Sequence, residues 1–331
     1  MSLIIAIVIV LILCFTFLNG ITDSSNIVAT MISSRAMTPR MALWITAIAE
    51  FIAPFIFGVN VANTIGSGIV ETENLKMGVI FSTLVSALIW NLFTWWFGIP
   101  SSSSHALIGG IIGAAVMAAG VSAIKVDGLV KVIIGLFSSP LIGLVSGFIL
   151  MKIVLYFGSF ASMGVNQFFK RAQFITALFL AFSYGTNDAQ KTLGIMTLTL
   201  YMIGYIQNFQ IPLEVIVVNS ALISLGTLLG GWRLIRTLGA KFYRIRPVHA
   251  FSTQLTSAIV ILANSFLGAP VSTTQVVSSA IMGVGSAERI SKVHWGVAKE
   301  IGMAWILTIP STALVSAGFY WLINHWFPQL F

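Results

Sequence analysis

The sequence predicts an all-α polytopic membrane protein, a bundle of helices that crosses the bilayer several times. Of its 331 residues, 57% are hydrophobic and only 8% are charged, whereas soluble domains carry about 25% charged residues. The mean hydropathy is +0.99. The apolar runs are continuous and lack the period-two alternation of a membrane β-strand, so each run is expected to be helical.

Apolar runs near the length that spans a bilayer, roughly 20 residues, occur along the whole chain. They occupy 2–19, 40–59, 76–98, 129–156, 172–186, 213–230, 248–268 and 301–327. Two further runs, 99–120 and 269–286, contain Pro, Ser and Gly, so we expect broken helices or re-entrant half-helices there. No Lys or Arg precedes the first run and no small-residue cleavage pattern follows it, which favours a retained helix over a signal peptide.

The net charge of +8 comes from basic residues in short loops, the pattern of cytoplasmic loops in membrane proteins. It therefore gives no reason to expect nucleic acid as a partner. The loops predicted on the other side carry Glu71, Glu73 and Glu214, with Lys76 as the nearby base. We expect a multi-pass protein of the cell (inner or plasma) membrane with its amino terminus outside. The basic residues that indicate this are Arg35, Arg40, Lys170, Arg171, Arg233, Arg236, Lys241, Arg244 and Arg246.

Three segments recur in the same order in the two halves of the chain, which indicates an internal duplication. The segments begin at Asp23 and Asp188, at Gly58 and Gly231, and at Gly98 and Gly268. Loop charge gives the two halves opposite orientations, so we expect an inverted-repeat helical bundle whose broken helices meet at the midplane of the membrane. The repeats are expected at 1–156 and 172–331, joined by a short basic cytoplasmic linker at 157–171.

Two acidic residues in the repeated segments, Asp23 and Asp188, lie at the ends of the apolar runs. A carboxylate inside a membrane costs several kcal/mol or more, so it usually marks an ion path or a buried partner. With Asn26 and Asn187 they offer the hard oxygen ligands that suit a small cation. We expect these four residues to couple transport to Na⁺ or H⁺, with Asp23, Asn26 and Asp188 as the candidate Na⁺ ligands.

The other repeated feature is a hydroxyl cluster directly after a proline, at Ser102, Ser103 and Ser104 and again at Ser272, Thr273 and Thr274. Each cluster begins a half-helix, whose N-terminus carries partial positive charge and unpaired N–H groups. A single N-cap explains one hydroxyl per cluster but not three. We expect the two clusters to bind one tetrahedral oxyanion. Lys191, one helical turn after Asp188, either contacts this anion or neutralises Asp188.

Five further residues are secondary candidates: Glu50, which has no acidic counterpart in the second half, and Asn63, Thr64, His105 and Gln275 from the repeated segments. Cys14 is the single cysteine, which excludes a disulfide within the chain and a clustered-thiolate metal site. The sequence contains no catalytic triad or Walker loop. We therefore expect no enzyme activity and no covalent cofactor.

These segments resemble the PiT family of inorganic phosphate transporters. Asn19 to Asn26 resembles the first signature of the family, and Gly185 to Gly194 resembles the second closely. The two Pro-hydroxyl segments, Gly231-Trp-Arg and Pro247-Val-His249 extend the resemblance over nearly the whole chain. Ile21-Thr22 stands where Ala-Asn is more usual, and Gln275 replaces a common His. The chain lacks the long central hydrophilic loop of larger members, so it resembles the compact prokaryotic type.

The resemblance implies a homodimeric symporter in the lipid bilayer that takes up inorganic phosphate with Na⁺ or H⁺ by alternating access. A sulfate permease of the same family and a passive anion channel are the alternatives, and a membrane sensor or scaffold is a third. A carboxylate that accepts the proton of hydrogen phosphate favours phosphate over sulfate. Acidic residues beside the anion site favour a coupled carrier over a channel.

Overall fold

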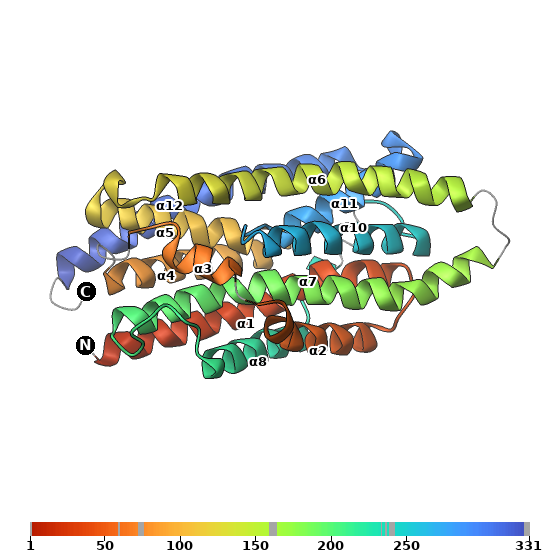
Figure 1. The fold of residues 1–331 in the computed structure, drawn as a ribbon. Coiled ribbons are helices and arrows are strands. Elements are labelled where there is room, and N and C mark those ends of the chain that lie inside the picture. Colours follow the sequence, from red (N-terminus) through yellow and green to blue (C-terminus); the bar gives the residue numbers. More distant parts are fainter. Residues whose placement is uncertain are drawn as a thin grey trace.

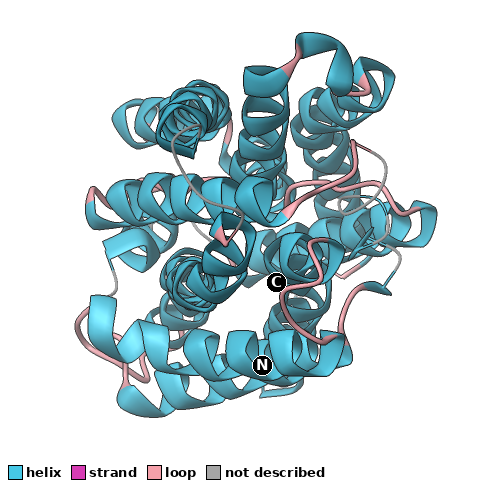
Figure 2. Cartoon of the chain, turned by 90° about the vertical axis from the view of Figure 1, so that its right-hand side faces the viewer, coloured by secondary structure: helices cyan, strands magenta, loops and turns pink. Residues whose placement is uncertain are grey.

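The computed structural model describes residues 2–58, 60–71, 76–158, 164–232, 234–235, 237 and 242–327. The molecule is a bundle of helices, of which the longest are α1 (Ser2–Ser33), α6 (Val126–Gly158), α7 (Val165–Met202) and α12 (Trp295–Trp326). Each has at least 32 residues. Viewed along the bundle, the described chain consists of helices joined by short loops (Figure 2). The predicted all-α membrane fold is confirmed.

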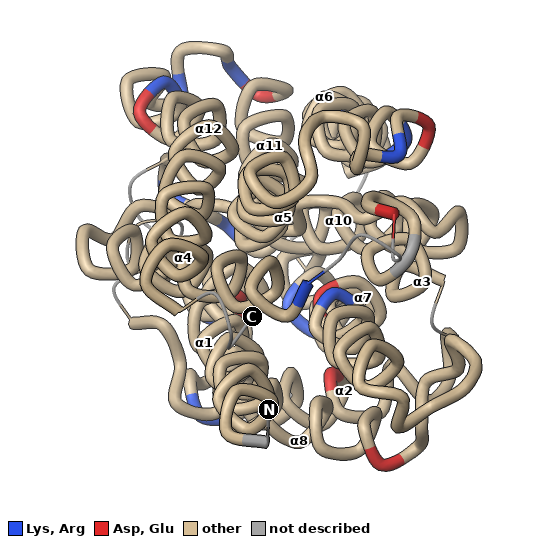
Figure 3. Tube along the Cα trace, turned by 90° about the vertical axis from the view of Figure 1, so that its left-hand side faces the viewer, with Lys and Arg blue, Asp and Glu red and all other residues tan. Residues whose placement is uncertain are grey.

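Five of the described helices are long and apolar enough to cross a membrane: α1, α6, α12, α2 (Pro39–Phe57) and α4 (Met77–Phe97). Charged positions are sparse along the trace (Figure 3), and many large apolar side chains are exposed, among them Ile134, Leu141 and Leu314. Such a surface suits lipid rather than water. The shorter helices α3 (Asn60–Ser67) and α8 (Leu213–Leu229) pack on the long ones, α3 on α7 and α8 on α1.

The helices α1 and α7 run past the polar segments that were expected to end them. Asp23 was predicted at the end of a run over 2–19, and Asp188 at the end of one over 172–186, but both lie inside uninterrupted helices. The hydroxyls of Ser24 and Ser25 donate to the carbonyls of Ile21 and Thr22, at 2.8 and 2.6 Å. Because such local bonds satisfy polar side chains within the helix, polarity does not end it.

Two helical hairpins occupy opposite ends of the bundle. One pairs α4 with α5 (Ser103–Ala119) at the end that holds both termini, and the other pairs α10 (Pro247–Phe266) with α11 (Thr273–Glu288) at the far end (Figure 1). At their tips, Gly98 and Gly268 adopt positive φ angles of 66° and 67°, which glycine tolerates best. Pro100 and Pro270 follow within the non-helical tips. The predicted helix breaks are thus confirmed.

The second helix of each hairpin packs closely on a long outer helix, α5 on α12 and α11 on α6. A Cβ atom added to Gly113 would lie 2.0 Å from the carbonyl oxygen of Ala313, and one added to Gly283 would lie 2.1 Å from that of Leu144. Small residues allow this approach of helix backbones in membranes. The expected linker, 157–171, overlaps the end of α6 and the start of α7, and residues 159–163 lie outside the described part of the chain.

Candidate functional site

The tips of the two hairpins meet between α1 and α7, and this brings the hydroxyl clusters of both halves together. Ser104 of the first tip donates to the carbonyl of Val271 in the second, at 3.0 Å. Asn26 of α1 donates to the Thr274 hydroxyl at 2.8 Å, and Thr273 donates to Asp188 of α7 at 2.8 Å. The structure thus joins polar residues that are up to about 250 positions apart in the sequence.

Within each cluster, the first hydroxyl caps its helix. The Ser102 side chain accepts from the backbone N–H of His105 at 3.1 Å, and the Ser272 side chain accepts from that of Gln275 at 3.4 Å. These serines therefore do the N-capping that one hydroxyl per helix accounts for. The two residues after each cap are also buried, Ser103 and Ser104 in α5 and Thr273 and Thr274 in α11. Their hydroxyls are in excess of what capping requires.

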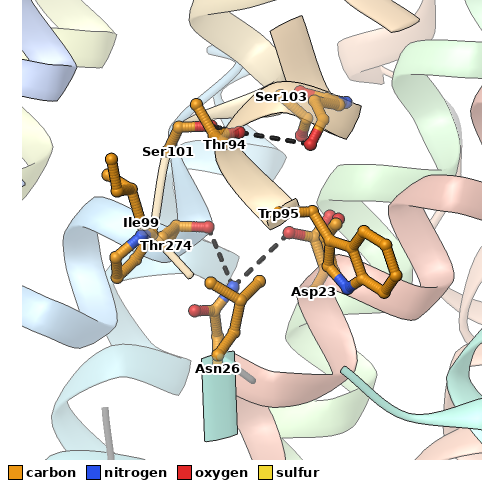
Figure 4. A pocket seen from close by; sticks show the side chains of 12 residues that line it. Asp23, Asn26, Thr94, Trp95, Ile99, Ser101, Ser103 and Thr274 are labelled. Carbon is orange, nitrogen blue, oxygen red and sulfur yellow. Dashed lines mark hydrogen bonds between the residues drawn. The ribbon is translucent and has the colours of Figure 1, made fainter. Parts of the chain in front are cut away.

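Asp23 lies buried beside a small cavity. The Asn26 amide reaches Asp23 Oδ1 at 3.4 Å, while Oδ2 has no hydrogen-bond partner among the described residues. The cavity leaves about 10 Å³ for the centre of a water molecule, which is room for about one water. Figure 4 shows Asp23 and Asn26 of α1 beside Ser103 and Thr274 of the two tips. Burying a carboxylate oxygen without a partner costs free energy, so binding of a cation or a proton there is favoured.

Asp188 has a different environment. Lys191 Nζ forms an ion pair with Asp188 Oδ1, and Thr273 donates to Oδ2. Asp188 and Lys191 are each only 1% exposed. The preceding residue, Asn187, donates to Ser265 Oγ at 2.9 Å, and its Oδ1 has no partner within the described structure. Of the two roles expected for Lys191, the contact seen is the one with Asp188.

Each hairpin tip also accepts a hydrogen bond from a threonine that lies outside the two hairpins. Thr64 of α3 donates to the carbonyl of Gly268 at 2.7 Å, and Thr237, which follows α8 in the chain, donates to that of Gly98 at 3.0 Å. These threonines correspond to each other in the repeated segments, and so do the two glycines. Gly239, which belongs to the same repeated segment, lies outside the described residues.

The secondary candidates differ in burial and in the helices that they contact. His105 and Gln275 contact each other, with 2.9 Å between Nδ1 and Nε2. Glu50 is buried in α2, where it accepts a hydrogen bond from Thr227 of α8. It packs directly on α7, since a Cβ on Gly185 would lie 2.8 Å from its Cα. Asn63 is exposed on α3, so the structure does not bring it to the buried site.

Sequence reasoning missed three polar residues around Asp23, namely Asn91, Thr94 and Ser101. Asn91 of α4 donates to Asn19 Oδ1 of α1 at 3.2 Å, and the hydroxyls of Thr94 and Ser101 lie 2.8 Å apart. Asn91, Thr94 and Ser101 line the cavity beside Asp23. An isolated Asn inside an apolar helix is itself a signal, because polar side chains in membrane helices usually face the protein interior.

The assembled site combines two chemistries. Two helix N-termini and their spare hydroxyls supply donors for an anion, while buried carboxylates and amides supply oxygen ligands for a small cation. No group of three or more His, Cys, Asp or Glu side chains that would hold a metal ion occurs in the described part of the chain. The arrangement of donors and oxygen ligands suits an anion and a small cation bound next to each other.

Comparisons with known proteins give matches along nearly the whole chain. A family model described as "Phosphate transporter family" matches residues 19–316. A protein of Rhizobium meliloti (strain 1021) named as a probable low-affinity inorganic phosphate transporter is 43% identical over 92% of each chain. A Bacillus subtilis (strain 168) protein of the same name is 41% identical over 98% of this chain and 99% of its own. A solved structure titled "The sodium-dependent phosphate transporter" is 26% identical with a TM-score of 0.88, covering 98% of this chain and 100% of that one.

Proposed function

Because the chain belongs to the phosphate transporter family, as its resemblance to PiT proteins predicted, we propose that it is a secondary active transporter. It carries inorganic phosphate across the cell membrane in symport with a cation, by alternating access. The relatives are named as transporters, so the expectation that the chain is not an enzyme is confirmed. The solved relative is titled sodium-dependent, which supports Na⁺ as the coupling ion, with H⁺ as the alternative.

One observation carries this proposal. Two helix N-termini, each with hydroxyls beyond its cap, point into the bundle where Asp23 and Asp188 are buried. A phosphate ion there accepts hydrogen bonds from Ser103, Ser104, Thr273 and Thr274, with the caps Ser102 and Ser272 behind them. A carboxylate repels the anion unless a positive charge lies between them. Cation and phosphate therefore bind together, which is the physical basis of symport.

The coupling cation binds on the side of α1 and α7. Asp23 and Asn26 provide oxygens beside the small cavity. On α7, Asn187 has an amide oxygen without a partner in the described structure, and Asp188 is paired with Lys191. Glu50 is a supporting residue, because it is buried against α7 at Gly185, two residues before Asn187. The His105–Gln275 pair joins the starts of α5 and α11 and keeps the two anion-binding termini in register.

We further propose that the two halves, 1–156 and 172–331, are inverted repeats. The opposite entry of the two hairpins (Figure 1) and the matched bonds of Thr64 and Thr237 support this arrangement. In such transporters the substrate site lies where the broken helices of the two repeats meet. The amino terminus faces the outside, and the protein acts as the homodimer that its resemblance to the family implies.

The test is uptake of labelled phosphate by purified protein in liposomes, with an inward Na⁺ gradient in one arm and an inward proton gradient in another. We expect one gradient to drive accumulation and a tenfold excess of sulfate to leave it nearly unchanged. Uptake that follows only the phosphate gradient would make the protein a passive anion channel. Strong inhibition by sulfate would make it a sulfate permease.

A further inference from the structure

The two halves of the site differ in charge at one corresponding position. In the first half, the residue three after the aspartate is the neutral Asn26, and in the second half it is Lys191. Both residues lie one helical turn after their aspartate. Asn26 donates a hydrogen bond to Thr274 of α11. Lys191 pairs with Asp188, which also accepts a hydrogen bond from Thr273 of α11. The substitution therefore places a fixed positive charge in only one half.

In the second half, both carboxylate oxygens of Asp188 have a partner. Asp188 receives the ammonium of Lys191 on Oδ1 and the hydroxyl of Thr273 on Oδ2. Both charged residues are almost fully buried. A buried charge is tolerated only when it is paired and hydrogen-bonded. Asp188 meets that condition with protein groups alone, so it has no need of an ion from solution.

In the first half, the compensation is missing. The groups beside Asp23 are neutral, the Asn26 amide at 3.4 Å and the Thr274 hydroxyl, and Asp23 Oδ2 has no hydrogen-bond partner among the described residues. The cavity beside it is also lined by Asn26, Ser103 and Thr274. Lys191 is the nearby positive charge, but it is already paired with Asp188. The Asp23 carboxylate therefore has no cationic side chain of its own within the described structure.

We propose that the Lys191 ammonium replaces one coupling cation, so that phosphate is carried with a mobile cation at Asp23 only. This inference rests on the proposed function of cation-coupled transport and specifies its stoichiometry. The Lys191–Asp188 pair is neutral as a unit and moves no net charge. A neutral residue at position 191 would turn Asp188 into a second site for a mobile cation.

The experiment measures phosphate uptake in liposomes against the concentration of the coupling cation for the unmodified protein and for Lys191→Asn. Below saturation, a tenfold drop in cation should lower uptake about 10-fold in the unmodified protein and about 100-fold in Lys191→Asn, by mass action at one and two sites. Lys191→Arg keeps the charge and should follow the unmodified protein. The double variant Asn26→Lys/Lys191→Asn moves the fixed charge to the other half and should restore the 10-fold dependence.

Thermal unfolding in detergent gives a readout that does not depend on transport. Because a ligand that binds the native state raises its stability, Na⁺ should raise the melting temperature of Lys191→Asn more than that of the unmodified protein. A Lys191→Asn variant with unchanged cation dependence and weaker phosphate binding would overturn the inference and assign Lys191 to the anion. If the unmodified protein ignored every cation gradient, cation coupling itself would fail, a result distinct from unchanged stoichiometry.

Discussion

The hydroxyls at the two hairpin tips differ in the contacts that they make. Ser102 and Ser272 are occupied as N-caps, whereas Thr274 accepts a bond from Asn26 and Thr273 donates one to Asp188. The latter two therefore connect the N-terminus of α11 to Asn26 of α1 and Asp188 of α7. A change at these positions should alter ligand binding more than helix stability.

Replacing Thr274 with Val removes the hydroxyl at nearly constant volume, and Thr274→Ser retains it. We expect Thr274→Val to weaken phosphate binding about 10-fold or more, since a hydrogen bond to a charged group contributes about 1.5–3 kcal/mol. Thr274→Ser should bind nearly as well as the unmodified protein. Calorimetric titration of the purified protein with phosphate measures both constants, and equal affinities for the two variants would restrict Thr274 to a structural role.

The residues that sequence alone could identify are those that the repeat marks twice. Asp23, Asp188 and the hydroxyl clusters recur at matched positions, and the structure brings them together. Asn91 does not recur, because at the offset that pairs Pro100 with Pro270 its counterpart is Ile261. Nor does sequence reveal which face of its helix is buried when apolar residues surround it on all sides. Its contact with Asn19 depends on how α1 and α4 pack, which only the folded bundle specifies.

Among the helices, those bounded by Gly and Pro were predicted closely and those with internal polar residues were not. The run expected at 76–98 corresponds to α4 at Met77–Phe97, because Gly98 ends it in a left-handed conformation. The same signal is missing after Asp23, where α1 continues to Ser33. Ser24, Ser25 and Asn26, which follow Asp23, form hydrogen bonds within the helix or across the bundle. The sequence does not distinguish such a polar segment from a helix end.

The threonine contacts make a prediction about hairpin movement. Thr64→Val removes a bond to the Gly268 carbonyl at the α10–α11 tip, and Thr237→Val removes the one to Gly98 at the α4–α5 tip. A bond worth about 1 kcal/mol, once lost, should expose the released tip about 5-fold more often. In a Cys14→Ala background, maleimide should label Ala269→Cys faster when Thr64→Val is present, and Ile99→Cys faster when Thr237→Val is present.

Each variant serves as the control for the other, because only the tip that its threonine holds should respond. Thr64→Ser and Thr237→Ser keep the hydroxyl and should label at the original rate. Equal acceleration at both tips would indicate general loosening of the bundle instead of two separate contacts.

At the scale of the whole molecule, the two ends of the bundle differ in charge. The end that holds both termini (Figure 1) carries Lys76, Lys125 and Lys131 near the membrane, and Lys125 is paired with Glu71. The other end carries Arg35, Arg40, Lys152, Lys170, Arg171, Arg244, Arg246, Arg289 and Lys292. Basic residues concentrate on the cytoplasmic side of membrane proteins, so this asymmetry supports the proposal that the amino terminus lies outside.

Single cysteines in the Cys14→Ala background test this orientation. Val121 and Tyr205 are 76% and 74% exposed at the end that holds the termini, and Ile290 is 69% exposed at the other. In intact cells, a membrane-impermeant maleimide should label Val121→Cys and Tyr205→Cys at once, and Ile290→Cys only after permeabilisation. The opposite pattern would invert the molecule. With the expected pattern, the α4–α5 hairpin occupies the outer end of the bundle and the α10–α11 hairpin the inner end. Thr237 then holds the tip of the outer hairpin, and Thr64 holds the tip of the inner one.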